Sequence, residues 1–348
     1  MMKEDLRSLD HTQLQDVITL LGEKKYRADQ IYRWLHVQGV QTYAAMTNVP
    51  AKLTEQLDAK YMIYPVRQET MLESRYDGTR KYLFSLHDGN VIESVFMRYE
   101  HGNAVCISSQ VGCNMGCRFC ASTIDGKVRD LTPGEMLGQI YAVMEDTGEK
   151  VSHVVVMGSG EPLENYVNLL TFLKMLTDEY GQNISQRNVT VSTCGLCDRI
   201  KTLADEQLQI TLAISLHAPD DAKRKELMPV ANRYSLPELI DACRYYFDKT
   251  GRRITFEYAL IRGENDSEKD AETLAALVRG MNCHINLIPV NPVRERNYQQ
   301  SDKNAVLAFK NKLEKNHINV TIRREMGRDI DGACGQLRRR HLAHSGDA

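Results

Sequence analysis

At residues 111–120 the chain reads Val111-Gly112-Cys113-Asn114-Met115-Gly116-Cys117-Arg118-Phe119-Cys120, which places three cysteines within eight residues. Their spacing is Cys-x-x-x-Cys-x-x-Cys. Thiolates are ligands of iron–sulfur clusters and of zinc, and three thiols this close can bind one small inorganic group. A cubic four-iron cluster normally takes four ligands, so three protein ligands leave one iron open to a small molecule. The spacing therefore predicts Cys113, Cys117 and Cys120 as ligands of a catalytic 4Fe-4S cluster.

Two alternatives for this motif are a structural zinc site completed by a distant His or Cys, and three cysteines that only pack. Zinc sites usually pair their ligands and repeat the pair further along the chain, and no such second pair follows here. An aromatic residue precedes the last cysteine, and a glycine precedes each of the other two. In these features the motif resembles the radical S-adenosylmethionine (SAM) superfamily, whose sites also bind SAM.

Length and composition indicate a globular protein of 348 residues, long enough for one large α/β domain and a smaller attachment. The N-terminus has no apolar segment and no stretch reaches membrane-spanning length, so we expect a soluble, cytoplasmic protein without membrane contact. Nine cysteines in such a chain favour metal or redox chemistry over disulfides. The net charge is only −2, but residues 303–341 hold ten Lys/Arg and four Asp/Glu, a basic tail that would suit a phosphate backbone.

The first hundred residues divide into two patterns. Residues 1–60 have apolar residues at helical spacing and predict a helical accessory domain, with an RNA-binding face or an ordinary exposed face as the alternatives. The candidate phosphate contacts there are Lys24, Lys25, Arg27 and Arg33. Residues 61–102 alternate between apolar and polar around Asp88-Gly89, which predicts a β-hairpin extension.

From residue 103 the pattern alternates between strand and helix, which predicts a parallel sheet or barrel over residues 103–325. The predicted strands are Ala104–Ser109, Val154–Met157, Val189–Thr193, Leu212–Leu216, Thr255–Leu260, Ile285–Ile288 and, as a possible seventh, Val320–Arg323. The clearest predicted helices are Pro133–Met144, Leu169–Leu176 and Leu236–Phe247. The superfamily resemblance makes this α/β region a partial (β/α)6 barrel, followed by a C-terminal segment over residues 326–348.

Polar or small residues follow several predicted strands, where the sites of parallel sheets lie. These strand ends are Gly158-Ser159-Gly160-Glu161-Pro162, Ser192-Thr193-Cys194-Gly195, Ser215-Leu216-His217-Ala218 and Val290-Asn291-Pro292. Glycines let the backbone approach a ligand closely. Taken alone, each end has an ordinary explanation, because a glycine cluster is usually a turn and a lone histidine is usually a hydrogen-bonded core residue.

Two cysteines outside the cluster motif are candidates for chemistry. Cys106 lies on the first predicted strand, and Cys334 lies in a polar, Gly-rich segment where a thiol could be reactive. Cys243 and Cys283 lie in apolar patterns and are expected to pack, and packing is one possibility for Cys197. Cys194 is close to the expected site, and its role stays open.

Over nearly its whole length the chain resembles the RlmN/Cfr family of RNA adenosine methyltransferases. The resemblance rests on Arg-Ala-x-Gln-Ile-x-x-Trp at 27–34, Cys-Ile-Ser-Ser-Gln-Val-Gly-Cys at 106–113, the cluster motif, Gly-Glu-Pro at 160–162, Ser-Leu-His-Ala at 215–218, Asn-Leu-Ile-Pro-x-Asn-Pro at 286–292 and Asp-Ile-Asp-x-Ala-Cys-Gly-Gln-Leu at 329–337. Several independent motifs occur in the same order. The chain departs from the commonest family form at Ser159 and Cys194, and neither change removes a matched ligand.

The resemblance implies a reaction that explains both the cluster and the extra thiols. Carbon 2 of adenine is electron-poor and a weak nucleophile toward the methyl group of SAM, so radical chemistry is needed. Cys334 would accept a methyl group from one SAM, and a second SAM on the open iron would yield a deoxyadenosyl radical that activates it. Glu93 would take the ring proton, and Cys106 would form a disulfide with Cys334 to release the product. Without the resemblance, Glu93 would be taken as a solvent-facing strand residue.

The resemblance also implies the ligands and partners. The SAM contacts would be Gly160, Glu161, Ser192, Ser215, Leu216, His217 and Asn291. The substrates would be 23S ribosomal RNA at the peptidyl transferase centre and the adenosine 3′ of the tRNA anticodon, with an electron donor such as flavodoxin or ferredoxin. The alternatives are Cfr-type methylation of carbon 8, which would give antibiotic resistance, and a non-catalytic RNA-binding protein with zinc. We expect a monomer, because one barrel can hold SAM and a single nucleotide.

Overall fold

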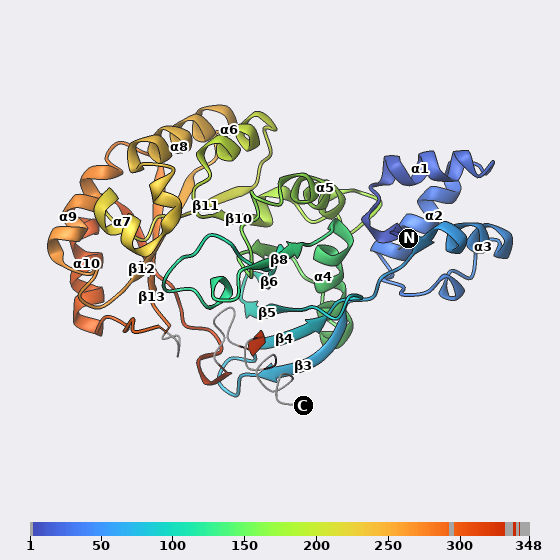
Figure 1. Cartoon of the computed structure of the whole chain (residues 1–348), viewed down its shortest axis with the longest axis horizontal. Coiled ribbons are helices and arrows are strands. Elements are labelled where there is room, and N and C mark those ends of the chain that lie inside the picture. Colours follow the sequence, from blue (N-terminus) through green and yellow to red (C-terminus); the bar gives the residue numbers. More distant parts are fainter. Residues whose placement is uncertain (1–2, 292–295, 331–336, 339–340, 342–348) are drawn as a thin grey trace.

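The computed structural model describes residues 3–291, 296–330, 337–338 and 341, and its centre is one ten-stranded sheet. The strand order is β14-β13-β12-β11-β10-β9-β6-β5-β4-β3, with β14 and β3 at the two edges. Figure 1 shows that the helices connecting the parallel strands lie around the outside of this sheet. Within the described ranges, no helix is both long and apolar enough to cross a membrane.

Seven parallel strands form the larger part of the sheet. They are β6 (Gly102–Ile107), β9 (His153–Val156), β10 (Val189–Thr193), β11 (Thr211–Ser215), β12 (Ile254–Leu260), β13 (Cys283–Pro289) and β14 (Asn319–Ile322). Each corresponds to a predicted strand: the bounds of β10 agree, and the ends of the others differ by at most two residues. The connecting helices are α4 (Pro133–Thr147), α5 (Tyr166–Thr177), α6 (Cys197–Asp205), α7 (Asp221–Leu227), α8 (Leu236–Thr250), α9 (Glu268–Leu277) and α10 (Lys303–Lys315). Six strand–helix units followed by β14 confirm the predicted partial (β/α)6 barrel.

The longer helices have strong local start and stop signals. At the start of α4, Thr132 and Glu135 form a capping box around Pro133, and Gly148 ends the helix in the left-handed conformation. The α8 helix repeats this arrangement, with Ser235 as its cap and Gly251 at its end. These residues satisfy backbone groups that have no partner inside the helix, which fixes where each helix begins and ends.

Three antiparallel strands extend the barrel sheet beyond β6. They are β3 (Arg67–Glu73), β4 (Arg80–Ser85) and β5 (Val91–Tyr99), and β5 pairs directly with β6. The hairpin of β4 and β5 was predicted, whereas β3 was not. Two short strands, β7 (Gln110–Gly112) and β8 (Lys127–Asp130), pair with each other around the cluster motif.

Side chains alternate between the two faces of the sheet. On one face, residues such as Val154, Val156, Phe256 and Tyr258 are fully buried in the core that includes the helices. The opposite face, called the inner face below, carries Cys106 in a small separate apolar cluster with neighbouring strand residues. The sheet therefore separates a packed outer core from an inner face that is available for chemistry.

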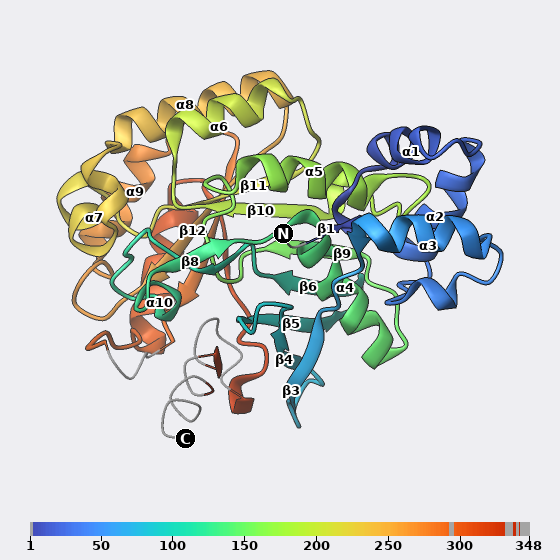
Figure 2. The same ribbon diagram turned by 45° about the vertical axis from the view of Figure 1, so that its right-hand side comes forward.

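The N-terminal helices α1 (His11–Leu20), α2 (Tyr26–His36) and α3 (Ala51–Lys60) form a module beside α4 and α5, with β1 (Glu4–Asp5) paired to β2 (Tyr61–Met62). Figure 2 shows this module at the end of the molecule opposite α7 and α9. The fully buried Arg7 anchors it, because its Nη2 donates to the carbonyl of Val40 at 2.9 Å. The guanidinium also lies 5.8 Å from the ring centre of Tyr141 on α4.

We expect Arg7→Ala to lower the free energy of unfolding by about 2 to 5 kcal/mol, because it removes a buried side chain and leaves the carbonyl of Val40 without its donor. Lys52→Ala, at an exposed position on α3, is the control and should change stability by less than about 0.5 kcal/mol. Denaturant unfolding followed by circular dichroism measures both values. A loss below about 1 kcal/mol for Arg7→Ala would contradict this role.

Candidate active site at the carboxyl edge of the sheet

The cluster motif forms a loop between β7 and β8. Gly112 has φ +77°, and a Cβ there would lie 1.9 Å from the carbonyl oxygen of Gly126, so only glycine fits this crossing. Cys113 is buried, whereas Cys117 and Cys120 are partly exposed. The amide of Cys120 donates to the carbonyl of Cys117 at 3.1 Å, which closes a tight turn between these two cysteines. The loop thus holds all three thiols on one short segment.

The three thiols are electrostatic neighbours. Burial, followed by the nearby Cys120 thiol, raises the pKa of Cys113 to about 12. Burial also raises the pKa of Cys117 well above its ordinary value, and Cys120 and Cys113 add to this effect. Thiols that disfavour each other's charged form would be stabilised as thiolates by a metal cluster.

A fully buried guanidinium lies behind this loop. Arg224 on α7 donates through Nη2 to the carbonyl of Cys194 at 2.7 Å and through Nε to that of Leu216 at 3.3 Å. It is close enough to Cys117 to favour that residue's thiolate form. Its Nη1 is buried without a hydrogen-bond partner among the described residues. A buried cation near Cys117 fits the charge of an anionic cluster on this loop.

Among the described residues, no group of three His, Cys, Asp or Glu side chains converges in the way that a single metal ion requires. A cubic cluster makes a different demand, because each thiolate binds a different iron. The loop geometry and the Arg224 charge therefore fit a 4Fe-4S cluster on Cys113, Cys117 and Cys120 better than a structural zinc ion.

The end of β9 carries the Gly-Glu-Pro motif next to the cluster loop. Gly160 has φ +113°, and a Cβ there would come within 2.7 Å of Gln110 and Ser109. The buried Glu161 accepts hydrogen bonds from the amides of Leu163 at 3.0 Å and Cys194 at 2.7 Å. Glu161 thus ties the β9 end to the β10 end, and burial raises the pKa of its carboxyl. Cys194, left open by the sequence, is a buried part of this connection.

His217, after β11, is held in one orientation. Its φ is +54°, its Nδ1 accepts from the amide of Ala259 at 2.9 Å, and its carbonyl accepts from Asn265 Nδ2 at 2.7 Å. Burial lowers its pKa to about 3, so the imidazole is neutral at physiological pH. Its ring meets the Phe119 ring edge-to-face, with 4.9 Å between centroids. His217 is therefore a hydrogen-bonded histidine that also contacts the cluster loop.

The remaining predicted SAM contacts come from several strand ends. Ser192 lies on β10 and Ser215 on β11, both partly exposed, while Leu216 is fully buried and Asn291 is exposed beyond β13. Ser192 pairs in register with Ala213, and Ser215 is two residues further along that strand, on the same face. The strand ends therefore bring these residues to one edge of the sheet.

Glu93 and Cys106 share the inner face. Val95 pairs with Cys106 across β5 and β6, and Glu93 lies two residues from Val95, on the same face. Glu93 is only 2% exposed, so the solvent-facing alternative is wrong for this residue. Its carboxylate lies 3.3 Å from Lys81 Nζ on β4, and the lysine is fully buried.

The C-terminal segment crosses the same region. Met326 packs against the apolar cluster that contains Cys106. Asp329 accepts hydrogen bonds from Ser74 Oγ at 2.7 Å and from the amide of Arg75 at 3.0 Å, in the turn between β3 and β4. Further on, the amide of Arg338 donates to Glu93 Oε1 at 2.6 Å. Cys334 itself lies outside the described residues, and both flanking parts of the chain contact the hairpin.

Sequence reasoning missed Lys81 and Arg224 as parts of the site. Both are charged residues with no exposed area, and Lys81 was read only as one polar position of an alternating strand. The signal that could have identified Lys81 was its position relative to Glu93 in the predicted hairpin. Lys81 and Glu93 lie at inward positions of the two strands of one predicted hairpin, so their opposite charges could meet across it.

Two models of known families match separate regions of the chain. The model described as the radical SAM superfamily matches residues 107–275. The model described as the ribosomal RNA large subunit methyltransferase N-terminal domain matches residues 4–63, which contain the helical module. The matched regions together include the cluster motif and most of the barrel strands.

Individual relatives match nearly the whole chain. A Lachnospira eligens protein named "Probable dual-specificity RNA methyltransferase RlmN" is 60% identical over 341 residues, 97% of each chain. The protein of the same name from Alkaliphilus oremlandii is 55% identical over 342 residues, covering 98% of this chain and 99% of its own. The crystal structure of a radical SAM methyltransferase from Sphaerobacter thermophilus has a TM-score of 0.91 at 41% identity, covering 96% of this chain and 98% of its own. The chain therefore belongs to the RlmN family of radical SAM RNA methyltransferases, a family that uses a 4Fe-4S cluster and SAM.

Proposed function

We propose that this methyltransferase acts on carbon 2 of an adenosine in 23S ribosomal RNA, and on the adenosine 3′ of the tRNA anticodon, through an S-methylcysteine on Cys334. The observation that carries the proposal is the position of Glu93 and Cys106 on one inner face, with contacts from the chain on both sides of Cys334. Glu93, as the proposed base, and the Cys106 thiol would then lie beside the segment that carries the methyl group. The relatives' name, dual-specificity RNA methyltransferase, supports two RNA substrates.

Cys113, Cys117 and Cys120 would hold the cluster. SAM would be bound by residues at the strand ends, namely Gly160, Glu161, Ser192, Ser215, Leu216, His217 and Asn291. When bound, these groups supply radical chemistry at a carbon that polar methyl transfer does not reach. Glu93 accepts the proton from carbon 2 of the adenine. The Cys106 thiolate then attacks the Cys334 sulfur, so that a disulfide bond forms and the bond from that sulfur to the methylene carbon breaks. The methylene carbon keeps the electron pair and takes up the proton held by Glu93, which completes the methyl group on the base.

A cavity of about 490 Å³ lies at the carboxyl ends of the strands, and the charges of its lining support RNA as the partner. Its lining includes the cationic residues Arg262, Lys303, Arg323 and Arg328 and the acidic residues Asp302 and Glu325. Both acids have partners, because Asp302 caps α10 and Glu325 pairs with Arg328 at 3.6 Å. Within the described chain, Arg262 and Lys303 form no ion pair. Among the residues that the structure describes, the cavity thus offers two cations without an acidic partner to a phosphate backbone.

The other parts of the proposal follow from the reaction. Residues 1–60 would be an RNA-binding accessory domain, since Lys24, Lys25 and Arg33 are exposed on its surface. The hairpin of residues 61–102 and the barrel of 103–325 would form the catalytic unit, with residues 326–348 carrying the methyl-accepting cysteine. A one-electron donor such as flavodoxin or ferredoxin would reduce the cluster, and a monomer would suffice for catalysis in the cytoplasm.

The reaction product tests the proposed function. We expect expression of the chain in a host lacking its own enzyme of this family to produce 2-methyladenosine in 23S ribosomal RNA and in tRNA. Mass spectrometry of nucleosides, with synthetic 2-methyladenosine and 8-methyladenosine as standards, measures this. Expression of Glu93→Gln is the control and should lower the yield at least about tenfold, because the variant lacks a base. A product methylated at carbon 8 would contradict the proposed position, and its absence from tRNA would contradict the second substrate.

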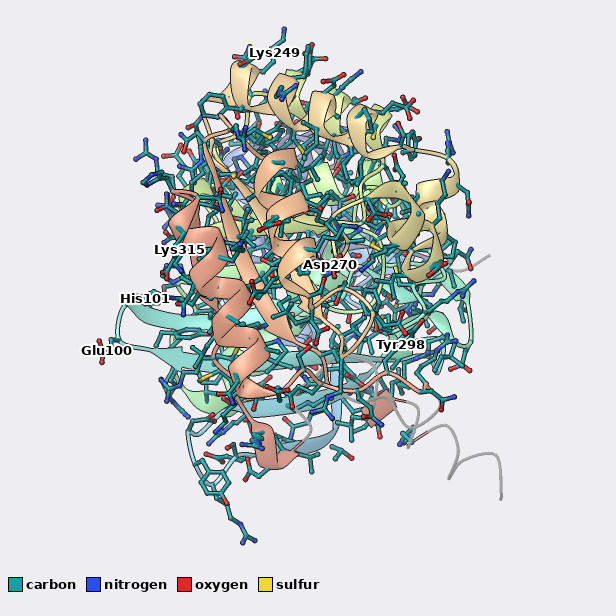
Figure 3. All side chains as sticks on the ribbon, turned by 90° about the vertical axis from the view of Figure 1, so that its left-hand side faces the viewer. Glu100, His101, Lys249, Asp270, Tyr298 and Lys315 are labelled. Carbon is teal, nitrogen blue, oxygen red and sulfur yellow. The ribbon has the colours of Figure 1, made fainter. Side chains whose placement is uncertain are left out.

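Reversing the charge of one cationic residue tests whether RNA binds in the cavity at the carboxyl ends of the strands. We expect Arg262→Glu to weaken RNA binding about tenfold near 0.1 M salt and to reduce the slope of log affinity against log salt by about 1. Lys315→Glu, at the far end of α10, is the matched control with the same charge change. Figure 3 shows Lys315 on one side of the molecule and Tyr298, which follows β13, on the other. Equal losses in both variants, measured by fluorescence anisotropy, would contradict a specific contact in the cavity.

A further inference from the structure

Lys81 is a fully buried lysine on the inner face, and the reaction described above does not use it. It lies on β4 and pairs in register with Val95, while the next inward residue, Leu83, pairs with Glu93. Lys81 and Glu93 are therefore diagonal neighbours on one face of the hairpin. Lysine is almost never fully buried unless it is paired, because removing an ammonium from water is costly.

The carboxylate of Glu93 is held through both oxygens. Oε2 lies 3.3 Å from Lys81 Nζ, and Oε1 accepts the amide hydrogen of Arg338 at 2.6 Å. The two donors differ in origin, since Lys81 belongs to the sheet and Arg338 to the C-terminal segment. Arg338 is itself tied to the hairpin, because its Nε donates to the carbonyl of Val91 at 3.0 Å.

The ion pair gives the buried side chain of Glu93, the proposed base, a partner within the protein. Glu93 is only 2% exposed, so its carboxylate has little contact with water and needs hydrogen-bond donors from the protein. The Lys81 ammonium, 3.3 Å from Oε2, is one such donor. The lysine also restrains the Glu93 side chain, because the stiff hairpin fixes where the ammonium can lie.

We propose that Lys81 is a positioning residue for the methyl transfer, which binds Glu93 Oε2 and thereby holds the carboxylate with Oε1 toward the adenine. This inference rests on the proposed role of Glu93 and extends it to a residue that the family resemblance did not assign. In the proton transfer, the bond between carbon 2 and its hydrogen breaks, a bond from Oε1 to that hydrogen forms, and the electron pair stays in the ring. The adenine takes the place of the Arg338 amide at Oε1.

A double-mutant cycle tests the inference, with Lys81→Met, Glu93→Gln and the double variant in the full-length, cluster-loaded enzyme. We expect Lys81→Met to lower the rate of RNA methylation at least about tenfold, and the double variant to be no slower than Glu93→Gln alone. Lys81→Arg, which keeps the charge, should recover most of the lost rate. Independent losses that multiply in the double variant would show that Lys81 does not act through Glu93, and would overturn the inference.

An isotope measurement separates positioning from a general structural role. With RNA that carries deuterium at carbon 2 of the target adenosine, we expect Lys81→Met to show an isotope effect on product formation about twofold larger than the parent enzyme. The reason is that proton removal becomes the slow step. An unchanged isotope effect in a slow Lys81→Met variant would overturn the inference, as would parental activity in that variant.

Two controls keep this result distinct from failure of the proposed function. Methylation of Cys334, read by peptide mass spectrometry, precedes the use of Glu93 and should be equal in the parent and in Lys81→Met. Its absence from the parent enzyme would refute the proposed function itself. Arg80→Met, on the same strand, removes ion pairs to Glu73 and Asp146 and should keep the parental isotope effect.

Discussion

The two-residue period of the sheet is the constraint on which the site depends. Along β5, Ile92 and Phe96 face the helix-covered core, whereas Glu93 faces inward. A slip of one residue between β5 and β6 would bury Ile92 in the site and turn Glu93 into the apolar core. The cost of burying that charge among hydrophobic side chains, together with the lost packing, fixes the register. The chemistry of the inner face thus depends on the hydrophobic packing of the outer one.

Buried polar groups then connect the strand ends to one another. Glu161 joins the ends of β9 and β10, Arg224 joins those of β10 and β11, and His217 contacts the next strand and the cluster loop. Each of these side chains hydrogen-bonds to backbone groups of neighbouring strand ends, so the loops that would surround SAM and the cluster are held by the protein itself. Breaking one of these contacts would leave a buried donor or acceptor unpaired, which makes the connections costly to disrupt.

Most of the fold could be predicted from the sequence, because alternating patterns and helix caps are local signals. The strands of the barrel and the β4–β5 hairpin follow from them, as does the cluster loop from its three cysteines. The β3 strand was missed because it lies at a sheet edge, where none of its seven residues is buried and no inward-outward alternation is visible. Lys81 and Arg224 were missed because their burial arises from contacts between distant segments. The roles of Cys106 and Cys334 came from family resemblance, since no local pattern links two thiols so far apart in the sequence.

The central claim is that a methyl group passes to the RNA through Cys334 and that Cys106 releases it. Mass spectrometry of a Cys106→Ala variant, isolated without oxygen after expression in cells, tests this claim most directly. The account predicts an RNA oligonucleotide bound covalently to Cys334, because the bond between its sulfur and the methylated adenine cannot be broken without the second thiol. An unmodified Cys334 with no RNA attached, in a variant that retains its cluster, would contradict the account.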